Sequence, residues 1–242
     1  MVFPVVGGRD PSEGYDVSRS LRYYATDQYE SFTPSSASNR RTWTWSGWIK
    51  NTESSNGNAF NLFGAGADVN NRAHIDWNTN GTFQVEAKSG GSTQLKHEGS
   101  TNVSDPNAWY HVVWRLDTTD GTSANRSRVY INGEQVVFSS LGATPSQNDD
   151  LAVNNNVIHV LGKRSYVDQN YFGGYLCEVH FTDGTSYAPT AFAKTDTNGV
   201  WVPIDCKDDL SYGTNGYYLE FKQTGTSQNS SGIGADTSGN DN

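Results

Sequence analysis

The chain has 242 residues but only two cysteines and one methionine, and no long run of apolar residues. No apolar segment approaches the ~20 residues that a membrane-spanning helix requires, so such a helix is not expected. The two cysteines form neither a CxxC pair nor a Cys/His cluster, which gives a zinc site no support. Because a reducing cytoplasm disfavours a disulfide, Cys177 and Cys206 are predicted to be buried thiols.

Basic residues are also scarce. The chain carries 17 Lys and Arg against 26 Asp and Glu, which gives a formal net charge of −9 and a pI near 4.9. A negative field repels phosphate backbones and anionic lipids, so nucleic acid and membrane insertion are not expected. The first residues, MVFPVVGGRDP, lack the basic region and the apolar length of a secretory signal. We therefore expect synthesis in a cytoplasm without export by the ordinary signal route.

Aromatic residues make up 12% of the chain, and 25 residues are glycines. This composition is typical of short strands joined by polar turns. In RRTWTWSGWIK (40–50), Trp43, Trp45 and Ile49 alternate with polar residues and predict a strand with one buried face. A sugar-stacking platform is the less favoured alternative, because aromatic residues on such a face usually supply burial. Trp48 falls on the opposite face and needs cover from the N-terminal arm or a long loop.

Further strands are predicted in AWYHVVWRLDTT (108–119), RVYINGEQVVF (128–138), VIHVLGKR (157–164), GGYLCEVHF (173–181) and GYYLEF (216–221). Asn132-Gly133 predicts a hairpin turn, because both residues tolerate positive φ. Alternation places Cys177 on the core face with Val179 and Phe181. Residues 188–194 are expected to hold one short helical turn. Strands without crossover helices indicate an antiparallel β-sandwich.

These segments carry a resemblance to a known family. The succession SLRYYATDQYESFTPSSASNRRTWTWSGWIK, AWYHVVWRLDTT, YINGEQV, GGYLCEVHFTDG and SYGTNGYYLEF resembles the LamG-like, concanavalin A-like jelly-roll domains of tail-fibre or appendage proteins of tailed phages, especially aquatic ones. The resemblance implies an all-β, antiparallel two-sheet jelly-roll sandwich. Residues 1–18 are expected to form an N-terminal arm or tether, and residues 19–242 a single LamG-like domain. The arm either packs across its own sandwich or grips a neighbouring subunit.

The resemblance also implies a role. We expect a non-enzymatic virion protein in a tail fibre or appendage, made in the host cytoplasm and assembled as a homo-trimer. It would bind host-surface glycan or contact other virion proteins through the arm. The alternatives are a purely structural decoration protein and a glycan depolymerase. Retaining hydrolysis needs two carboxyl groups about 5–5.5 Å apart, and no glutamate begins an E-x-D-x-x-E run. Glu178, close to His180, is expected to form a structural hydrogen-bonded pair with it.

Two segments are predicted to contact glycan, because they combine aromatic rings with Asn and Asp: HIDWNTNGTF (74–83), around a turn at Asn80-Gly81, and RSYVDQNYF (164–172). The candidate residues are Asp76, Trp77, Asn78, Asn80, Tyr166, Asp168, Asn170 and Tyr171. Trp77 and Tyr171 are the favoured surface aromatics. The competing interpretation is ordinary Asn/Asp-rich turns. No cofactor is expected. Many LamG-type domains hold calcium, but no calcium ligand can be assigned in this sequence.

Overall fold

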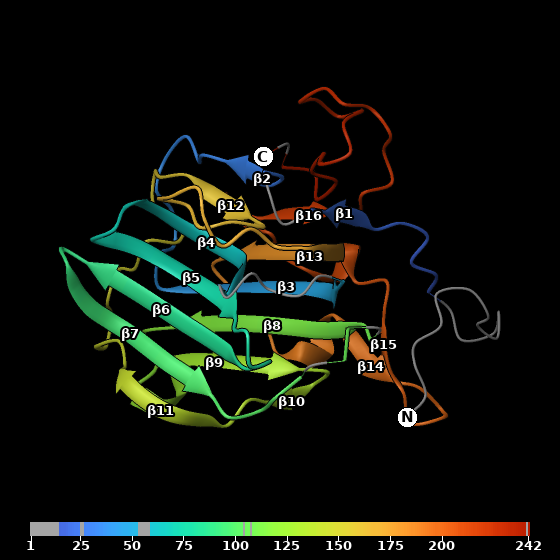
Figure 1. Cartoon of the computed structure of the whole chain (residues 1–242). Helices are drawn as coiled ribbons and strands as arrows, with labels where there is room; N and C mark the ends of the chain where they lie inside the picture. Colours follow the sequence, from blue (N-terminus) through green and yellow to red (C-terminus); the bar gives the residue numbers. More distant parts are fainter. Residues whose placement is uncertain (1–14, 25–26, 53–58, 104, 107, 241) are drawn as a thin grey trace.

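The computed structural model describes residues 15–24, 27–52, 59–103, 105–106, 108–240 and 242. Two large antiparallel sheets lie face to face, and a small third sheet lies beside them (Figure 1). The predicted jelly-roll sandwich is therefore confirmed. Within the described residues, helices are limited to single 3₁₀ turns: η1 (Ser123–Asn125), η2 (Pro189–Ala191) and η3 (Lys207–Asp209). The turn η2 falls where a short helical turn was predicted. None of these helices is long or apolar enough to cross a bilayer.

One large sheet, sheet A, has the order β1-β13-β3-β8-β9-β10, with β16 also paired to β13. Its strands are β1 (Leu21–Tyr23), β3 (Thr42–Asn51), β8 (Tyr110–Asp117), β9 (Ser127–Ile131), β10 (Glu134–Gln135), β13 (Gly174–Asp183) and β16 (Tyr217–Leu219). Each segment predicted as a strand from the sequence contributes here except 157–164, which contributes to the opposite sheet. The hairpin at Asn132-Gly133 joins β9 to β10, with φ values of 49° and 85°.

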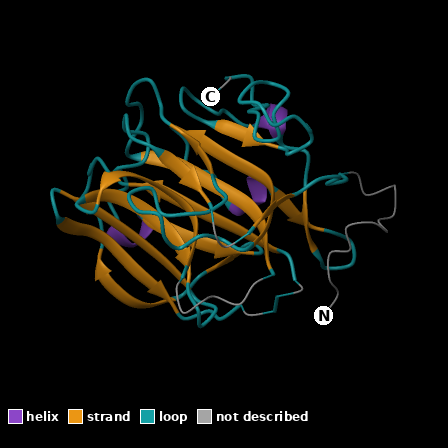
Figure 2. Ribbon diagram, turned by 45° about the horizontal axis from the view of Figure 1, so that its top comes forward, coloured by secondary structure: helices purple, strands orange, loops and turns teal. Residues whose placement is uncertain are grey.

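The other large sheet, sheet B, has the order β11-β7-β6-β5-β4-β12-β2. Its strands are β2 (Glu30–Phe32), β4 (Phe60–Asp68), β5 (Asn71–Trp77), β6 (Phe83–Ser89), β7 (Ser92–Gly99), β11 (Phe138–Ala143) and β12 (His159–Leu161). Strands make up most of the framework, and the loops gather at the margins (Figure 2). The predicted turn at Asn80-Gly81 joins β5 to β6, and Gly81 has a φ of 79°.

The core between the sheets is aromatic. Trp43, Trp45 and Trp114 are each 0% exposed. The rings of Trp43 and Trp114 meet edge to face at 4.7 Å within sheet A. Trp45 stacks on Phe63 of β4 at 5.8 Å and so joins the two sheets. The prediction that Trp43 and Trp45 belong to the core is confirmed.

The outer face of sheet A is covered by residues 187–212, which we call the cap. It contains η2, η3 and the third sheet, in which β14 (Ala193–Thr195) pairs with β15 (Trp201–Pro203). Trp48 is 5% exposed and packs with Cys177, Ala193 and Val17. Both suggested sources of cover for Trp48 are therefore present, since Val17 comes from the N-terminal arm. Residues 1–14 of that arm lie outside the described residues.

A bulge in β13 corrects the predicted face of Cys177. The register against β3 shifts between Cys177 and His180, and Glu178 adopts a φ of 48°. One residue is thereby inserted into the alternation, as in other β-bulges. Val179 and Phe181 face the main core, as predicted, but Cys177 faces the cap side with Trp48. Cys177 and Cys206 are both buried free thiols, which confirms that prediction.

Candidate functional site

The outer face of sheet B carries a buried polar network. Along β5, Ala73, Ile75 and Trp77 belong to the main core. The alternate residues Arg72, His74 and Asp76 point the other way, because successive side chains of a strand lie on opposite faces. Glu86 of β6 stands opposite His74 in the register. These four outward side chains are only 1–9% exposed, so something must cover them.

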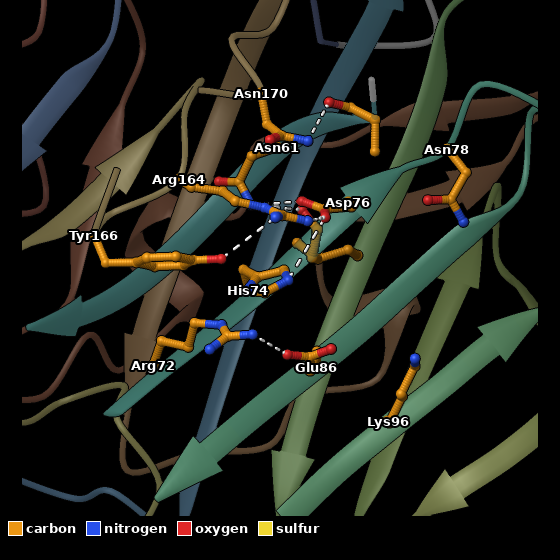
Figure 3. A network of polar contacts seen from close by, with 12 residues as sticks. Asn61, Arg72, His74, Asp76, Asn78, Glu86, Lys96, Arg164, Tyr166 and Asn170 are labelled. Carbon is orange, nitrogen blue, oxygen red and sulfur yellow. Dashed lines mark hydrogen bonds and ion pairs between the residues drawn. The ribbon is translucent and has the colours of Figure 1, made fainter. Parts of the chain in front are cut away.

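The cover is supplied by residues 162–172, which we call the covering loop. Its ends close on each other through a hydrogen bond from Phe172 N to Gly162 O of 2.7 Å. Asn170 fixes the loop to β4 and the residue before it: Asn61 N donates to Asn170 O at 2.9 Å, and Asn170 Nδ2 donates to Ala59 O at 2.8 Å. The covering loop is therefore held in place by main-chain bonds and by the side-chain amide of Asn170 (Figure 3).

An ion pair joins the covering loop to β5. Arg164 Nη2 donates to Asp76 Oδ2 at 2.6 Å, and Asn61 Nδ2 donates to Asp76 Oδ1 at 2.8 Å. Figure 3 shows Arg164 and Asn61 converging on this carboxylate. The side chain of Asp76 is 1% exposed, whereas that of Arg164 keeps 24% exposure. The structure thus brings together the two segments that were predicted separately, 74–83 and 164–172.

His74 lies beside this ion pair. Its Nε2 is 3.5 Å from Asp76 Oδ2, and neither ring nitrogen has a hydrogen-bond partner. Burial lowers the pKa of His74, and the opposing effect of the Asp76 charge does not offset it. His74 is therefore a neutral ring at pH 7. Its centre lies 6.5 Å from that of Tyr166 in the covering loop.

A second ion pair joins Arg72 to Glu86 across β5 and β6. The guanidinium carbon of Arg72 also lies 4.8 Å from the centre of the Tyr166 ring, within cation–π range. Each buried carboxylate of this face is therefore matched by one arginine, as buried charges require. Tyr166 lies over both the neutral histidine and one of the arginines.

Trp77 requires a correction, because the expected exposed tryptophan is 3% exposed. Its ring stacks on Phe83 at 5.4 Å and meets Tyr110 edge to face at 5.7 Å. Trp77 continues the core face of β5, so strand alternation carries it inward. Asp76 is also buried, and its oxygens are taken by Arg164 and Asn61. Its contribution to this face is to hold Arg164.

The other candidates have more exposed positions. Asn78 Nδ2 and Asn80 Oδ1 bond to the Thr82 side chain in the β5–β6 turn. Asp168 pairs with Lys163 at 2.5 Å, and this lysine lowers the pKa of the Asp168 carboxyl. Tyr171 is half-buried at the end of the covering loop. Asn78, Asn80 and Asp168 thus shape turns, as the competing interpretation holds, and whether any of these residues contacts glycan stays a prediction.

The charged residues of the network were missed at the sequence level. Arg72, Glu86 and Arg164 were not among the candidates, although NRAHIDW (71–77) shows the period of two that places Arg72 beside His74 and Asp76. Arg164 could not be found in this way, because its partner lies 88 positions earlier in the chain. Within the described part of the chain, no three His, Cys, Asp or Glu side chains gather as a metal-ion site.

The expected pairing of Glu178 with His180 is replaced by bonds to tyrosines. Tyr15 Oη donates to Glu178 Oε2 at 2.6 Å, and Tyr218 donates to the same oxygen at 2.5 Å. His180 Nδ1 lies 2.9 Å from Tyr212 Oη, and its ring stacks on Tyr218 at 4.1 Å. Burial raises the pKa of Glu178. This cluster lies on the cap side of sheet A, away from the polar face of sheet B.

Two facing seven-stranded sheets, one with a covered polar outer face, define a jelly-roll sandwich of the lectin type. Residues 25–191 match the model of the concanavalin A-like lectin/glucanases superfamily, and the chain belongs to this family. The match ends within η2, so most of the cap and the C-terminal residues lie beyond it. No curated protein matches the sequence.

Solved structures show the same fold at low identity. A candidate carbohydrate-binding protein of Bacteroides ovatus is similar at a TM-score of 0.51 and 14% identity, over 86% of this chain and 55% of that one. The CBM40 module of the Ruminococcus gnavus IT-sialidase matches at 0.49 and 12%, over 71% and 95%. Mouse laminin α1 domains LG4-5 match at 0.49 and 10%, over 70% and 43%. The chain thus spans little more than half of the Bacteroides protein.

Proposed function

We propose that this chain is a non-enzymatic glycan-binding domain and that the polar face of sheet B is its binding surface. The observation that carries the proposal is the Arg164–Asp76 ion pair, which draws the covering loop onto β5 and sets Tyr166 beside charged strand residues. Arg164 keeps 24% of its side chain exposed, and Lys96 of β7 keeps 43%. An aromatic ring next to exposed donors is the combination that sugar rings and hydroxyls require.

Membership of a superfamily described by lectins and glucanases supports a glycan ligand. It leaves binding and hydrolysis as alternatives, and on the polar face of sheet B the state of the carboxylates favours binding. Asp76 and Glu86 are each held by an arginine, and Glu178 by two tyrosines on the cap side of sheet A. A glycosidase needs one carboxyl group that is free to donate a proton and a second that is free to attack or to activate water.

The place of action is a virion appendage. The support is the sequence resemblance to tail-fibre and appendage domains of tailed phages. In the same proposal the chain assembles as a homo-trimer, because several weak glycan sites on one fibre raise the overall affinity without new contacts. Sedimentation equilibrium tests the trimer against the 26.5 kDa mass of one chain. Antibodies against the chain, viewed by electron microscopy, test whether the appendage of the phage particle carries it.

Retention on envelope polysaccharide of the host bacterium tests the binding proposal. The purified chain is incubated with immobilised polysaccharide, with and without calcium, and both retained protein and released reducing ends are measured. Retention without release is expected. Release of reducing ends would show a depolymerase, and absence of both would leave a structural or decoration role. Loss of retention in chelator would add a metal ion to the site.

Two variants locate the retention. Tyr166→Ala removes the ring of the covering loop, and Lys96→Ala removes an exposed donor of β7. Each is expected to weaken retention about tenfold, the effect of roughly one lost stacking or charged hydrogen-bond contact. Tyr24→Ala and Lys194→Ala are matched controls, because both residues are exposed. Tyr24 directly follows β1, and Lys194 lies in β14. Equal losses in the controls would refute the assignment to sheet B.

A further inference from the structure

A second concave surface lies at the opposite edge of sheet B from β11, at strand β2. Within the described residues β2 is an edge strand of sheet B and pairs with β12. A groove of about 790 Å³ opens there, lined by residues 29–32, 225–230 and 233–236 and by Asn242. Figure 1 shows the C-terminal segment, in red, beside β2 and β16. The wall formed by residues 225–230, 233–236 and Asn242 lies outside the family match, which ends at residue 191.

The C-terminal wall is tied together and to sheet A. Gly225 N donates to Ser231 O at 2.9 Å, and Ile233 N donates to Gly225 O at 3.0 Å. Asp236 Oδ1 accepts a hydrogen bond of 2.9 Å from the main chain of Tyr218 in β16. The groove is therefore bounded by hydrogen-bonded main chain on one side and by a strand on the other.

The carboxylate of Glu30 is unpaired inside this groove. Among the described residues, no donor bonds to it and no cation pairs with it. Burial raises the pKa of Glu30, and no neighbouring charge contributes to that shift. The side chain lies directly over Gly234, where an added Cβ would come within 2.7 Å of Glu30 Oε2. A carboxylate that is partly removed from water without a donor is costly unless a ligand supplies donors.

A tyrosine ring completes the arrangement. At the groove's mouth Tyr29 is 42% exposed, and Lys163 Nζ lies 4.3 Å from the centre of its ring. The lysine holds one side of the ring, and much of the ring remains accessible.

We propose that this groove binds a neutral oligosaccharide, with the Glu30 carboxylate accepting two sugar hydroxyls and the Tyr29 ring stacking on a sugar face. A carboxylate without a partner is an acceptor only, and vicinal hydroxyls supply two donors at matching spacing. The amide and hydroxyl groups of residues 226–230 line the opposite wall. Glu30 and Asp236 repel an anionic sugar, so the ligand carries no charge. This site deepens the proposed glycan binding and is separate from the polar face of sheet B.

Nuclear magnetic resonance titration of the full ¹⁵N-labelled chain tests the site. The probes are cellohexaose, maltohexaose and mannohexaose, each added to millimolar concentration in the presence and absence of a chelator. We expect at least one probe to shift the amide signals of residues 29–32 and 225–236, with no effect of chelator. Glu30→Gln and Tyr29→Ala are each expected to weaken this binding about tenfold, because a charged hydrogen bond and a stacking contact are lost.

Two control variants match the test residues. Tyr24 is 45% exposed and lies under Arg22 at 4.5 Å, as Tyr29 lies under Lys163. Glu134 is an exposed glutamate of β10 in the other sheet. Tyr24→Ala and Glu134→Gln are expected to leave the titration unchanged. Equal weakening by control and test variants would overturn the proposal.

The outcomes for the two sites are distinguishable. Shifts confined to residues 72–86 and 164–166 would overturn the groove and leave the polar face of sheet B as the binding surface. Shifts confined to the groove would support this proposal and remove the polar face. Absence of shifts with all three probes would overturn the groove. Loss of the groove shifts in chelator would also overturn it, because a bound cation would then be the partner of Glu30.

Discussion

On the outer face of sheet A the cap buries His111 and His180, whereas on the outer face of sheet B the covering loop buries Asp76 and Glu86. The histidines are kept neutral: burial lowers the pKa of each to about 3. The carboxylates are paired with arginines. The cap side of sheet A thus keeps its buried histidines uncharged, whereas the outer face of sheet B pairs its buried carboxylates with arginines and keeps one buried ring, His74, neutral.

Hydrogen bonding also differs between the cap and the covering loop. Trp201 Nε1 of the cap donates to His111 Nδ1 at 3.1 Å, and His111 Nε2 lies 2.8 Å from Ser46 Oγ. Because Nδ1 accepts, the proton of the neutral ring resides on Nε2, where it can be donated to Ser46. The cap thus depends on neutral rings with fixed tautomers. The covering loop depends on ion pairs, which respond to acid differently from neutral rings. Removing one member of such a pair leaves the other buried charge unpaired.

The largest effect is expected from Phe192→Ala in the cap. Phe192 is 2% exposed and packs against His111 and His180 with ring centres at 6.3 and 5.5 Å. Removing a buried Phe side chain costs roughly 3–5 kcal/mol of unfolding free energy, through lost burial and the cavity left behind. Urea denaturation measures it, with Leu141→Ala, at a residue 62% exposed, as a control. A loss as small as the control's would show that the cap contributes little to stability.

The next effect is expected from Asp76→Ala on the opposite face. Arg164 and Asn61 would lose their shared acceptor. The expected loss is about 3 kcal/mol, at the low end for a broken buried pair, because the Arg164 side chain keeps 24% exposure. The double change Asp76→Leu with Arg164→Met is expected to restore much of this stability, since no charge is left unpaired. If the double variant is no better than Asp76→Ala, unpaired charge is not the cause.

Acid tests the buried neutral histidines of the cap side directly. The unfolded histidines titrate near 6.5, while His111 and His180 titrate at about 3 in the fold. Their contribution is therefore complete above pH 6.5 and is lost as the pH falls toward 3, at up to about 1.4 kcal/mol per pH unit for each ring. The raised pKa of Glu178 acts with the opposite sign, because its protonation favours the fold in acid.

Urea denaturation between pH 7 and pH 4.5 measures this slope. His180→Gln is expected to flatten it, because one of the protons taken up on unfolding is removed. His111 and the other buried histidines with lowered pKa values, His74, His97 and His159, keep the rest of the slope. A matched change at a sheet-B ion pair, Arg72→Met with Glu86→Leu, should leave the slope nearly unchanged. A slope that is equally steep in His180→Gln would contradict the assignment to this ring.

The difference between sheets A and B also explains which strands could be predicted from the sequence. Most of sheet A was predicted from the sequence, except β1, because Trp43, Trp45 and Trp114 give strong period-two alternation. Strands β4 to β7 gave weaker indications, since β4 contains Gly64 and Gly66 and β5 carries Arg72, His74 and Asp76 on its outer side. Their burial comes from a loop nearly 90 positions later in the chain, and single-sequence periodicity contains no such pairing. Trp77 was taken for a surface residue because it stands beside the Asn-rich β5–β6 turn, whereas it continues the core face of β5.

The packing of the cap could not be predicted from local sequence patterns either. Glu178 has a φ of 48°, and this one bulged residue moved Cys177 to the cap side. Nothing in GGYLCEVHF marks the bulge, because the residue that adopts positive φ is a glutamate rather than a glycine. Asp76 and Tyr166 were predicted as glycan contacts in two separate segments, and Arg164, the residue that joins those segments, was not among the candidates.

The smallest effect is expected from Tyr166→Phe, which removes only a hydroxyl. Arg164 Nη1 donates to Tyr166 Oη at 3.3 Å, a long bond at a half-buried position. The expected loss of unfolding free energy is about 0.5 kcal/mol. Retention on polysaccharide is expected to stay within about twofold, because the ring that stacks on sugar is kept. Tyr166→Ala, by contrast, removes the ring and is expected to weaken retention about tenfold. If Tyr166→Phe and Tyr166→Ala weaken retention equally, the glycan contacts the hydroxyl rather than the ring. Arg164 then acts by positioning that hydroxyl.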